Sequence, residues 1–360
     1  MIRWWSRRPR ARGRAPLAPL APPVLWAAVA LVWEMASPLA RRADTPTRLV
    51  TSAVFCVVGV ALALGAFQRL RRELRQIHAV AEAAQQVLLR PLPHRLDGLS
   101  VAGVQLPAVP GAAVGGDLYE AVATPYGVRV IIGDVRGHGL AALGAVAAVL
   151  GSFREAAHEE PGLGGLLRRL ERALQRYVGE RVRDEGVLGA AGSPSAEEFV
   201  TVLLLDLHPN GDVLVLNCGH PWPYRIGDGA EPLAAGEPLP PLGAFPLPDT
   251  LPVRRCARLL PGEALFLHTD GAEEARDAAG RFFPLDAVLA DVAGPPRSPA
   301  DVIHHVRTAL LAHTGGRLTD DVAFVVVRDD RVPAAAPCAR VPGQTDRGGP
   351  RPARTAPSSR

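Results

Sequence analysis

The chain has 360 residues, of which 48% are hydrophobic and 21% are charged, and this composition excludes an intrinsically disordered protein. Arginine alone carries the basic side of a net charge of +4, because the chain contains no lysine. The arginines cluster near both ends and beside an apolar stretch, which favours a membrane over nucleic acid as the partner. The four cysteines are scattered without zinc-like spacing and are expected to be reduced thiols.

The first 67 residues predict a membrane anchor. Residues 1–21 form an arginine-rich segment, and two apolar stretches follow at about 22–40 and 49–67. The second carries no charge and is long enough to cross a bilayer, whereas Glu34 interrupts the first and leaves its crossing open. Arginines on both outer sides predict a transmembrane hairpin at residues 22–67, with both ends in the cytoplasm. We therefore expect a multi-pass protein of the inner (cytoplasmic) cell membrane.

Residues 68–92 predict a helical linker. Apolar residues from Leu70 to Leu88 recur at alternating spacings of four and three, which is a heptad pattern. Two interpretations stay open at this point. The helix either packs on its own domain or forms a coiled coil that joins two copies into a homodimer.

Residues 93–329 predict one α+β domain, because short apolar runs typical of strands occur in groups separated by helical patterns. The runs TVLLLDL and DVLVLNC, joined by HPNG, predict a β-hairpin. Residues 183–197 are expected to form a mobile loop, and residues 330–360, rich in Pro, Arg, Gly and Ser, a disordered tail. The helical patterns lie at 140–158, 164–179 and 299–313.

Acidic residues stand beside glycines or at the ends of predicted strands. They are Asp117 in AVGGDLYE, Asp134 in VIIGDVRGHG, Asp270 in LFLHTDG, and Asp320 and Asp321 in RLTDDVAFVVV. Each alone is typical of a turn or a helix cap. Strand ends, however, can bring residues that are distant in sequence to one rim of a sheet, so the ordered set predicts a common site.

Carboxylates gathered on one rim repel each other unless a cation neutralises them. An all-oxygen set suits Mg²⁺ or Mn²⁺, and two such ions can polarise a phosphoryl oxygen and support an in-line displacement. Glycines beside the acids let the backbone approach the ions closely. The residues therefore predict two Mn²⁺ or Mg²⁺ ions and the chemistry of phosphate removal.

Seven motifs occur in order: VGGDLYE, GDVRGHGLAAL, FVTVLLLDL, LNCGHPWPYRI, PPLGAF, LLPGEALFLHTDGAEEARD and LTDDVAFVVVR. The phrase QVLLRPLP, from Gln86 to Pro93, precedes them. With these motifs the chain, from about residue 80 to 329, resembles a metal-dependent protein phosphatase of the protein phosphatase 2C-like (PPM) superfamily, in its bacterial SpoIIE/RsbU branch. The resemblance implies an αββα sandwich, with two packed antiparallel sheets flanked by helices, preceded here by the two transmembrane helices and the linker.

The resemblance also implies roles for single residues, with a metal-activated water as the nucleophile. Asp134 would bridge two ions, with the Val135 carbonyl and Asp117 on one ion and Asp270 and Asp320 on the other. Asp321 would share the role of Asp320 or support it. Gly116, Gly133 and Gly271 would shape the turns, and Arg136 and His138 are candidates for holding the substrate phosphate.

Some positions depart from the family pattern. Glu120 stands where Asp is common, a conservative change that could reach an ion through water, and Gln105 stands where Tyr is usual. His220, in a Cys-Gly-His-Pro turn, is expected to be structural. The implied function is a phosphoserine/phosphothreonine protein phosphatase, acting on a phosphoprotein such as an anti-sigma-factor antagonist of the STAS type. The alternative is a catalytically weak membrane scaffold that binds a phosphoprotein, but the chain keeps every core acid. No nucleic-acid partner is expected.

Overall fold

The computed structural model describes residues 25–29, 45–108, 115–137, 140–187, 198–295 and 297–331. The helices are α3 (Thr45–Leu88), α4 (Leu140–Glu159), α5 (Leu163–Val187), α6 (Asp270–Glu274), α7 (Leu285–Ala290) and α8 (Pro299–Thr314). The strands are β1 (Arg95–Leu96), β2 (Leu99–Leu106), β3 (Asp117–Thr124), β4 (Gly127–Val135), β5 (Val200–Leu207), β6 (Asp212–Cys218), β7 (Tyr224–Ile226), β8 (Ala230–Pro232), β9 (Arg254–Arg258), β10 (Ala264–His268) and β11 (Val322–Asp329).

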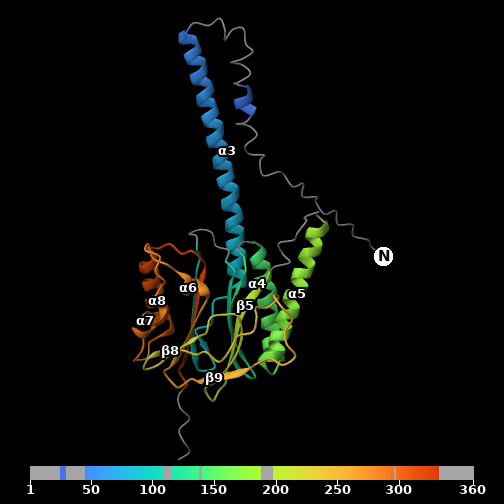
Figure 1. Ribbon diagram of the computed structural model, residues 1–360, viewed down its shortest axis with the longest axis vertical. Coiled ribbons are helices and arrows are strands. Elements are labelled where there is room, and N and C mark those ends of the chain that lie inside the picture. Colours follow the sequence, from blue (N-terminus) through green and yellow to red (C-terminus); the bar gives the residue numbers. More distant parts are fainter. Residues whose placement is uncertain are drawn as a thin grey trace, which may run out of the picture.

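The strands form two antiparallel sheets. The six-stranded sheet has the order β1-β2-β11-β10-β7-β8, and the five-stranded sheet has the order β3-β4-β5-β6-β9. Helices α4 and α5 cover one side of the pair, and α6, α7 and α8 cover the other (Figure 1). This arrangement confirms the predicted α+β sandwich of two antiparallel sheets with helices outside.

Three apolar cores correspond to the three boundaries between the layers. Leu118, Ile131 and Leu204 pack with α4 and α5 on the outer face of the five-stranded sheet. Val130, Leu203, Leu265 and Val325 fill the space between the sheets. The third core joins the six-stranded sheet to α7 and α8. Because both faces of each sheet are covered, the strands read as nearly continuous apolar runs.

The period of two along each strand decides which layer a side chain enters. In β4, Val128, Val130 and Ile132 face the other sheet, whereas Ile131 and Val135 face the helices. The same alternation turns the even-numbered Asp134, at the end of β4, toward the other sheet. The fold thereby directs this acid into the space between the sheets.

Helix α3 is longer than the predicted linker, because it continues from the second apolar stretch to Leu88 without interruption. It extends away from the sandwich (Figure 1). Within the described residues, one helix is long and apolar enough to span a bilayer, with a candidate span at Leu49–Arg72. The side chains at 73–75 and 77–86, which carry four of the six heptad positions, lie outside the described residues, so the homodimer stays a prediction.

The first apolar stretch is described only at residues 25–29, which are helical. There the Trp26 indole donates a hydrogen bond to the Phe55 carbonyl of α3 at 3.1 Å, and the two rings lie 5.3 Å apart. The other residues of this stretch, and the arginine-rich residues 1–21, lie outside the described part.

The three predicted helices of the domain are confirmed by α4, α5 and α8. The predicted loop at 183–197 is wrong at its start, because α5 continues to Val187. Residues 188–197 and 332–360 lie outside the described residues, and with them the rest of the loop and nearly all of the predicted tail.

Candidate functional site

Two of the predicted acids meet across a single pair of strands. Asp117, at the start of β3, is the direct partner of Asp134 near the end of β4. Both side chains point into the space between the sheets, and Asp117 is only 1% exposed. Next to the pair, the Val135 amide donates to the Gly116 carbonyl at 3.1 Å, which closes the turn in front of β3.

The remaining acids come from the six-stranded sheet. Asp270 begins α6 two residues after β10 ends, and Asp320 and Asp321 immediately precede β11, the neighbour of β10. The Thr269 hydroxyl donates to Asp117 Oδ2 at 3.2 Å and accepts from the Ala323 amide at 2.9 Å. This buried hydroxyl connects the acids of one sheet to the strand ends of the other.

Asp321 is held by the backbone around it. Its Oδ1 atom accepts from the Ala108 amide at 2.8 Å, and its own amide donates to Asp320 Oδ1 at 2.8 Å. The Asp320 carboxylate is exposed. Asp321 is therefore the inner, partly buried member of the pair, and Asp320 faces the solvent.

The acids share one electrostatic field. Burial first, and then Asp134 and Asp321, raise the pKa of Asp117 well above its usual value. Burial, followed by Asp270, Asp320 and Asp321, raises the pKa of Asp134 to about 8. The pKa of Asp270 is raised by burial and by Asp320. Burial and the acids of the six-stranded sheet thus destabilise the charged forms of Asp117 and Asp134, which is the situation that a bound cation relieves.

Glycines make room for this convergence. A Cβ atom on Gly116 would lie 2.3 Å from the Val135 carbonyl oxygen and 2.7 Å from Asp134 Oδ1. A Cβ on Gly115 would lie 2.4 Å from Asp321 Oδ2, and one on Gly271 would lie 2.1 Å from the Asp321 carbonyl oxygen. Side chains at these positions would fill the space around the acids.

The donor set fits hard divalent cations, because it consists of carboxylate and carbonyl oxygens only. In the part of the chain that the structure describes, no three acidic, histidine or cysteine side chains converge closely enough to enclose an ion as they stand. The acids are therefore neighbours that would have to draw together around an ion.

Of the two candidates for holding a phosphate, only Arg136 can be placed. Its amide donates to the Phe199 carbonyl at 2.9 Å, and its guanidinium lies 5.1 Å from the centre of the Phe199 ring. The side chain is exposed directly beyond the acid pair. His138 lies outside the described residues.

Glu120 is not an acid of this site. It stands three residues after Asp117, so the strand alternation turns it to the opposite face, toward α4. Its two carboxylate oxygens accept from Arg154 Nε at 3.0 and 2.7 Å, and Arg154 Nη2 donates to the Leu88 carbonyl at the end of α3 at 2.5 Å. The expectation that Glu120 could reach the ions through water is wrong. Gln105 lies on β2, opposite Ala323.

Two polar residues that the sequence analysis missed lie beside the acid pair, Thr201 and Thr269. Thr201 is the ladder partner of Asp134 in β5, and its Oγ1 atom accepts from the Asp134 amide at 3.3 Å. Nδ1 of the buried His220 lies 3.0 Å from the same hydroxyl. The only local signals were weak: Thr201 stands at an inward-facing position of the mostly apolar β5, and Thr269 directly follows the end of β10.

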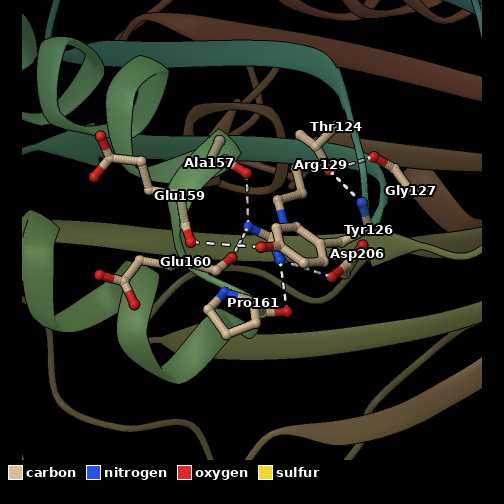
Figure 2. A network of polar contacts seen from close by, with 9 residues as sticks. All are labelled: Thr124, Tyr126, Gly127, Arg129, Ala157, Glu159, Glu160, Pro161 and Asp206. Atoms are coloured by element: carbon tan, nitrogen blue, oxygen red, sulfur yellow. Dashed lines mark hydrogen bonds and ion pairs between the residues drawn. The ribbon is translucent and has the colours of Figure 1, made fainter.

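The other end of β4 is fixed by a buried arginine. Figure 2 shows the Arg129 guanidinium above the Tyr126 ring, surrounded by carbonyl oxygens at the end of α4. It donates to the carbonyls of Ala157 at 2.7 Å and Pro161 at 3.0 Å, and to Asp206 Oδ2 at 3.3 Å. The strand that carries Asp134 is therefore anchored at both ends.

Comparison with known proteins identifies the fold. The family model described as Stage II sporulation protein E (SpoIIE) matches residues 124–330. The SiaA-PP2C domain of Pseudomonas aeruginosa is similar in structure with a TM-score of 0.53 and 19% identity, over 73% of this chain and 98% of that one.

Two further solved structures are similar at lower scores. The RsbU and RsbW domains of a Mycobacterium tuberculosis protein match at 22% identity and a TM-score of 0.49, over 67% of this chain and 61% of that one. The phosphatase domain and regulatory fragment of SpoIIE from Bacillus subtilis match at 17% identity and a TM-score of 0.48, over 66% and 64%. The chain thus spans less than two thirds of the length of each of these two relatives.

Proposed function

The chain belongs to the SpoIIE family of PP2C-like phosphatase domains, in the bacterial RsbU/SpoIIE branch, and from that premise we propose that it is a membrane-anchored, metal-dependent phosphoserine/phosphothreonine protein phosphatase. One observation carries the proposal: at a shared rim, burial and then neighbouring acids, among them Asp270 of the other sheet, raise the pKa of both Asp117 and Asp134. Divalent cations bound by these acids would neutralise their mutual repulsion.

The residues present would divide between two Mn²⁺ or Mg²⁺ ions. Asp134 would bridge them, with Asp117 and the Val135 carbonyl on one side and Asp270 and Asp320 on the other, and Asp321 would support Asp320. Gly116 and Gly271 would leave space for the acids, whereas a Cβ on Gly133 would meet the Thr201 carbonyl oxygen, so that glycine would keep β4 close to β5. When bound, such ions supply Lewis-acid polarisation of a phosphoryl oxygen and lower the pKa of water.

The chain's own groups would orient the phosphate. Arg136 is exposed beyond the acid pair, where its guanidinium can donate two hydrogen bonds to a phosphate. His138 would help to hold the same phosphate. The substrate of this proposal is a phosphorylated protein, for which an anti-sigma-factor antagonist of the STAS type is our first candidate.

The anchor is proposed from α3, whose apolar segment at Leu49–Arg72 can span a bilayer. The Trp26–Phe55 contact supports a second helix beside it, and hence a hairpin that leaves the catalytic domain in the cytoplasm. Carbonate extraction of membranes tests the anchor. Recovery of the full-length protein in the soluble fraction would contradict it.

The activity is tested on the full-length protein in detergent, with Mn²⁺, against an aryl phosphate and a phosphoserine protein. We expect Asp134→Asn and Asp270→Asn to lose the activity and chelator to remove it from the wild type. Asp228→Asn, which changes an exposed turn, is the matched control and should keep full activity. Equal rates in all four proteins, or activity in strong chelator, would refute the assignment.

A catalytically weak scaffold that only holds a phosphoprotein is the second candidate. The same assay separates the two, because a scaffold would bind the phosphoserine protein without releasing phosphate.

A further inference from the structure

The turn between β6 and β7 is where the chain leaves one sheet and enters the other. The Asn217 side chain clamps this turn, since its Nδ2 donates to the His220 carbonyl at 2.8 Å and its Oδ1 accepts from the His220 amide at 2.9 Å. Gly219 has a φ of +70°. The backbone of His220 is thereby fixed on both of its polar groups, so the point from which its side chain leaves the turn is fixed as well.

The His220 ring is directed at β5, the strand that pairs with the end of β4 where Asp134 stands. The residue is 4% exposed, and its Nδ1 atom lies 3.0 Å from Thr201 Oγ1. Burial and the neighbouring His268 lower the pKa of His220 to about 3, so the ring is neutral at physiological pH. A neutral imidazole can hold a hydroxyl in place without adding charge to the site.

Thr201 connects His220 to the backbone of Asp134. Its Oγ1 atom accepts from the Asp134 amide at 3.3 Å and lies 3.4 Å from the Asp134 carbonyl oxygen, across the β4–β5 ladder. Because the hydroxyl sits between His220 and the Asp134 backbone, its orientation depends on both. Backbone hydrogen bonds from Val135 to Gly116 and from Arg136 to Phe199 hold the residues after Asp134, and the Thr201 hydroxyl adds a side-chain contact to the Asp134 backbone itself.

We propose that His220 is a positioning residue, which acts through the Thr201 hydroxyl to fix the backbone of Asp134 and so maintains the geometry in which the acids of the two sheets draw together around divalent cations. It touches neither the substrate nor an ion. The inference rests on the proposed function, because it assigns His220 to the same metal-dependent site.

The first test distinguishes the effect of the Thr201 hydroxyl from the effect of the size and shape of the side chain. Thr201→Val replaces the hydroxyl by a methyl group of the same size, whereas Thr201→Ser keeps it. Binding of Mn²⁺ to the full-length protein in detergent is measured by the electron paramagnetic resonance signal of the free ion, with no turnover involved. We expect roughly tenfold weaker Mn²⁺ binding for valine, equivalent to about 1.4 kcal/mol, and near wild-type binding for serine.

The second test uses the position of the ring nitrogens. Asparagine places a polar atom where Nδ1 stands, glutamine places one where Nε2 stands, and leucine places none. We therefore expect His220→Asn to bind Mn²⁺ nearly as the wild type does, and His220→Gln and His220→Leu to match Thr201→Val. In the double variant with Thr201→Val and His220→Leu, the loss should be no larger than in either single variant, because both break one linkage.

Thr314→Val is the control for a lost buried hydroxyl. Thr314 donates to the Leu310 carbonyl of α8 at 3.0 Å, within its own helix. It should change the melting temperature without changing the affinity for Mn²⁺. Equal Mn²⁺ binding in Thr201→Val, His220→Leu and the wild type would overturn the inference, as would an equal loss in Thr314→Val. Wild-type protein that neither binds Mn²⁺ nor releases phosphate would instead refute the proposed function itself.

Discussion

Gly116→Ala should disable the site while leaving the sandwich folded. The new Cβ would lie 2.3 Å from the Val135 carbonyl oxygen, whereas ordinary contacts begin at 3.4 Å. Either the Gly116 turn or the end of β4 must therefore move by about 1 Å. Both positions belong to the proposed ion site, because the Val135 carbonyl and Asp134 Oδ1 are the two atoms nearest to the added carbon.

A misplacement of about 1 Å at reacting groups can lower the rate about 100-fold, or about 2.7 kcal/mol in transition-state stabilisation. The assay is kcat for an aryl phosphate at saturating Mn²⁺, measured beside the thermal unfolding of the same sample. Gly151→Ala is the matched control, because Gly151 lies on α4 with nothing within 4 Å of the added carbon. It should keep full activity and gain about 0.5–1 kcal/mol of stability. Wild-type kcat in Gly116→Ala would refute the argument.

Three further outcomes follow from contacts described above. Glu120→Gln should lower the free energy of unfolding by about 2–3 kcal/mol through its lost pairing with Arg154, yet leave Mn²⁺ affinity unchanged; weaker Mn²⁺ binding in calorimetry would return Glu120 to the site. Arg129→Met should cost about 3–5 kcal/mol in urea unfolding because Asp206 loses its buried partner, and replacing Asp206 by leucine as well should recover part of it. In chelator, the pKa of Asp134 is raised to about 8 in the folded state, so between about pH 4 and 8 the folded protein binds more protons than the unfolded one. The free energy of unfolding should therefore fall as pH rises from about 4 to 8. Asp134→Asn should flatten this fall in calorimetric scans, and a stability that rises with pH would contradict the reasoning.

The sequence predicted the acids because each stands beside a glycine or at a strand end, and both features are local. The sheets were predictable for the same reason, since a run such as the one in β4 is apolar at nearly every position and must be covered on both faces. Even the position of Glu120 was within reach, because an odd separation from Asp117 along a strand means opposite faces.

The polar supports of the site could not be predicted in this way. Threonine is an ordinary β-forming residue, so the positions of Thr201 within β5 and of Thr269 directly after β10 gave only a weak local signal. Their importance comes from contacts with residues far away in the sequence: Thr201 and Asp134 are 67 positions apart, and Thr269 and Asp117 are 152 positions apart. The continuity of α3 was missed for a different reason. The residues change from apolar to charged near Phe67, which suggested a membrane span followed by a separate linker, whereas the backbone forms one helix.

Because α3 is one continuous helix, the orientation of the sandwich relative to the apolar segment depends on the number of residues between them. An α-helix turns by about 100° and rises 1.5 Å per residue. If the apolar half of α3 is held in a bilayer, one residue inserted between Arg72 and Leu88 would swing the sandwich through more than a quarter turn about the helix axis. Seven inserted residues would nearly restore its heading while lifting it by about 10 Å. Within this segment the number of residues, as much as their identity, fixes the direction in which the acid rim faces.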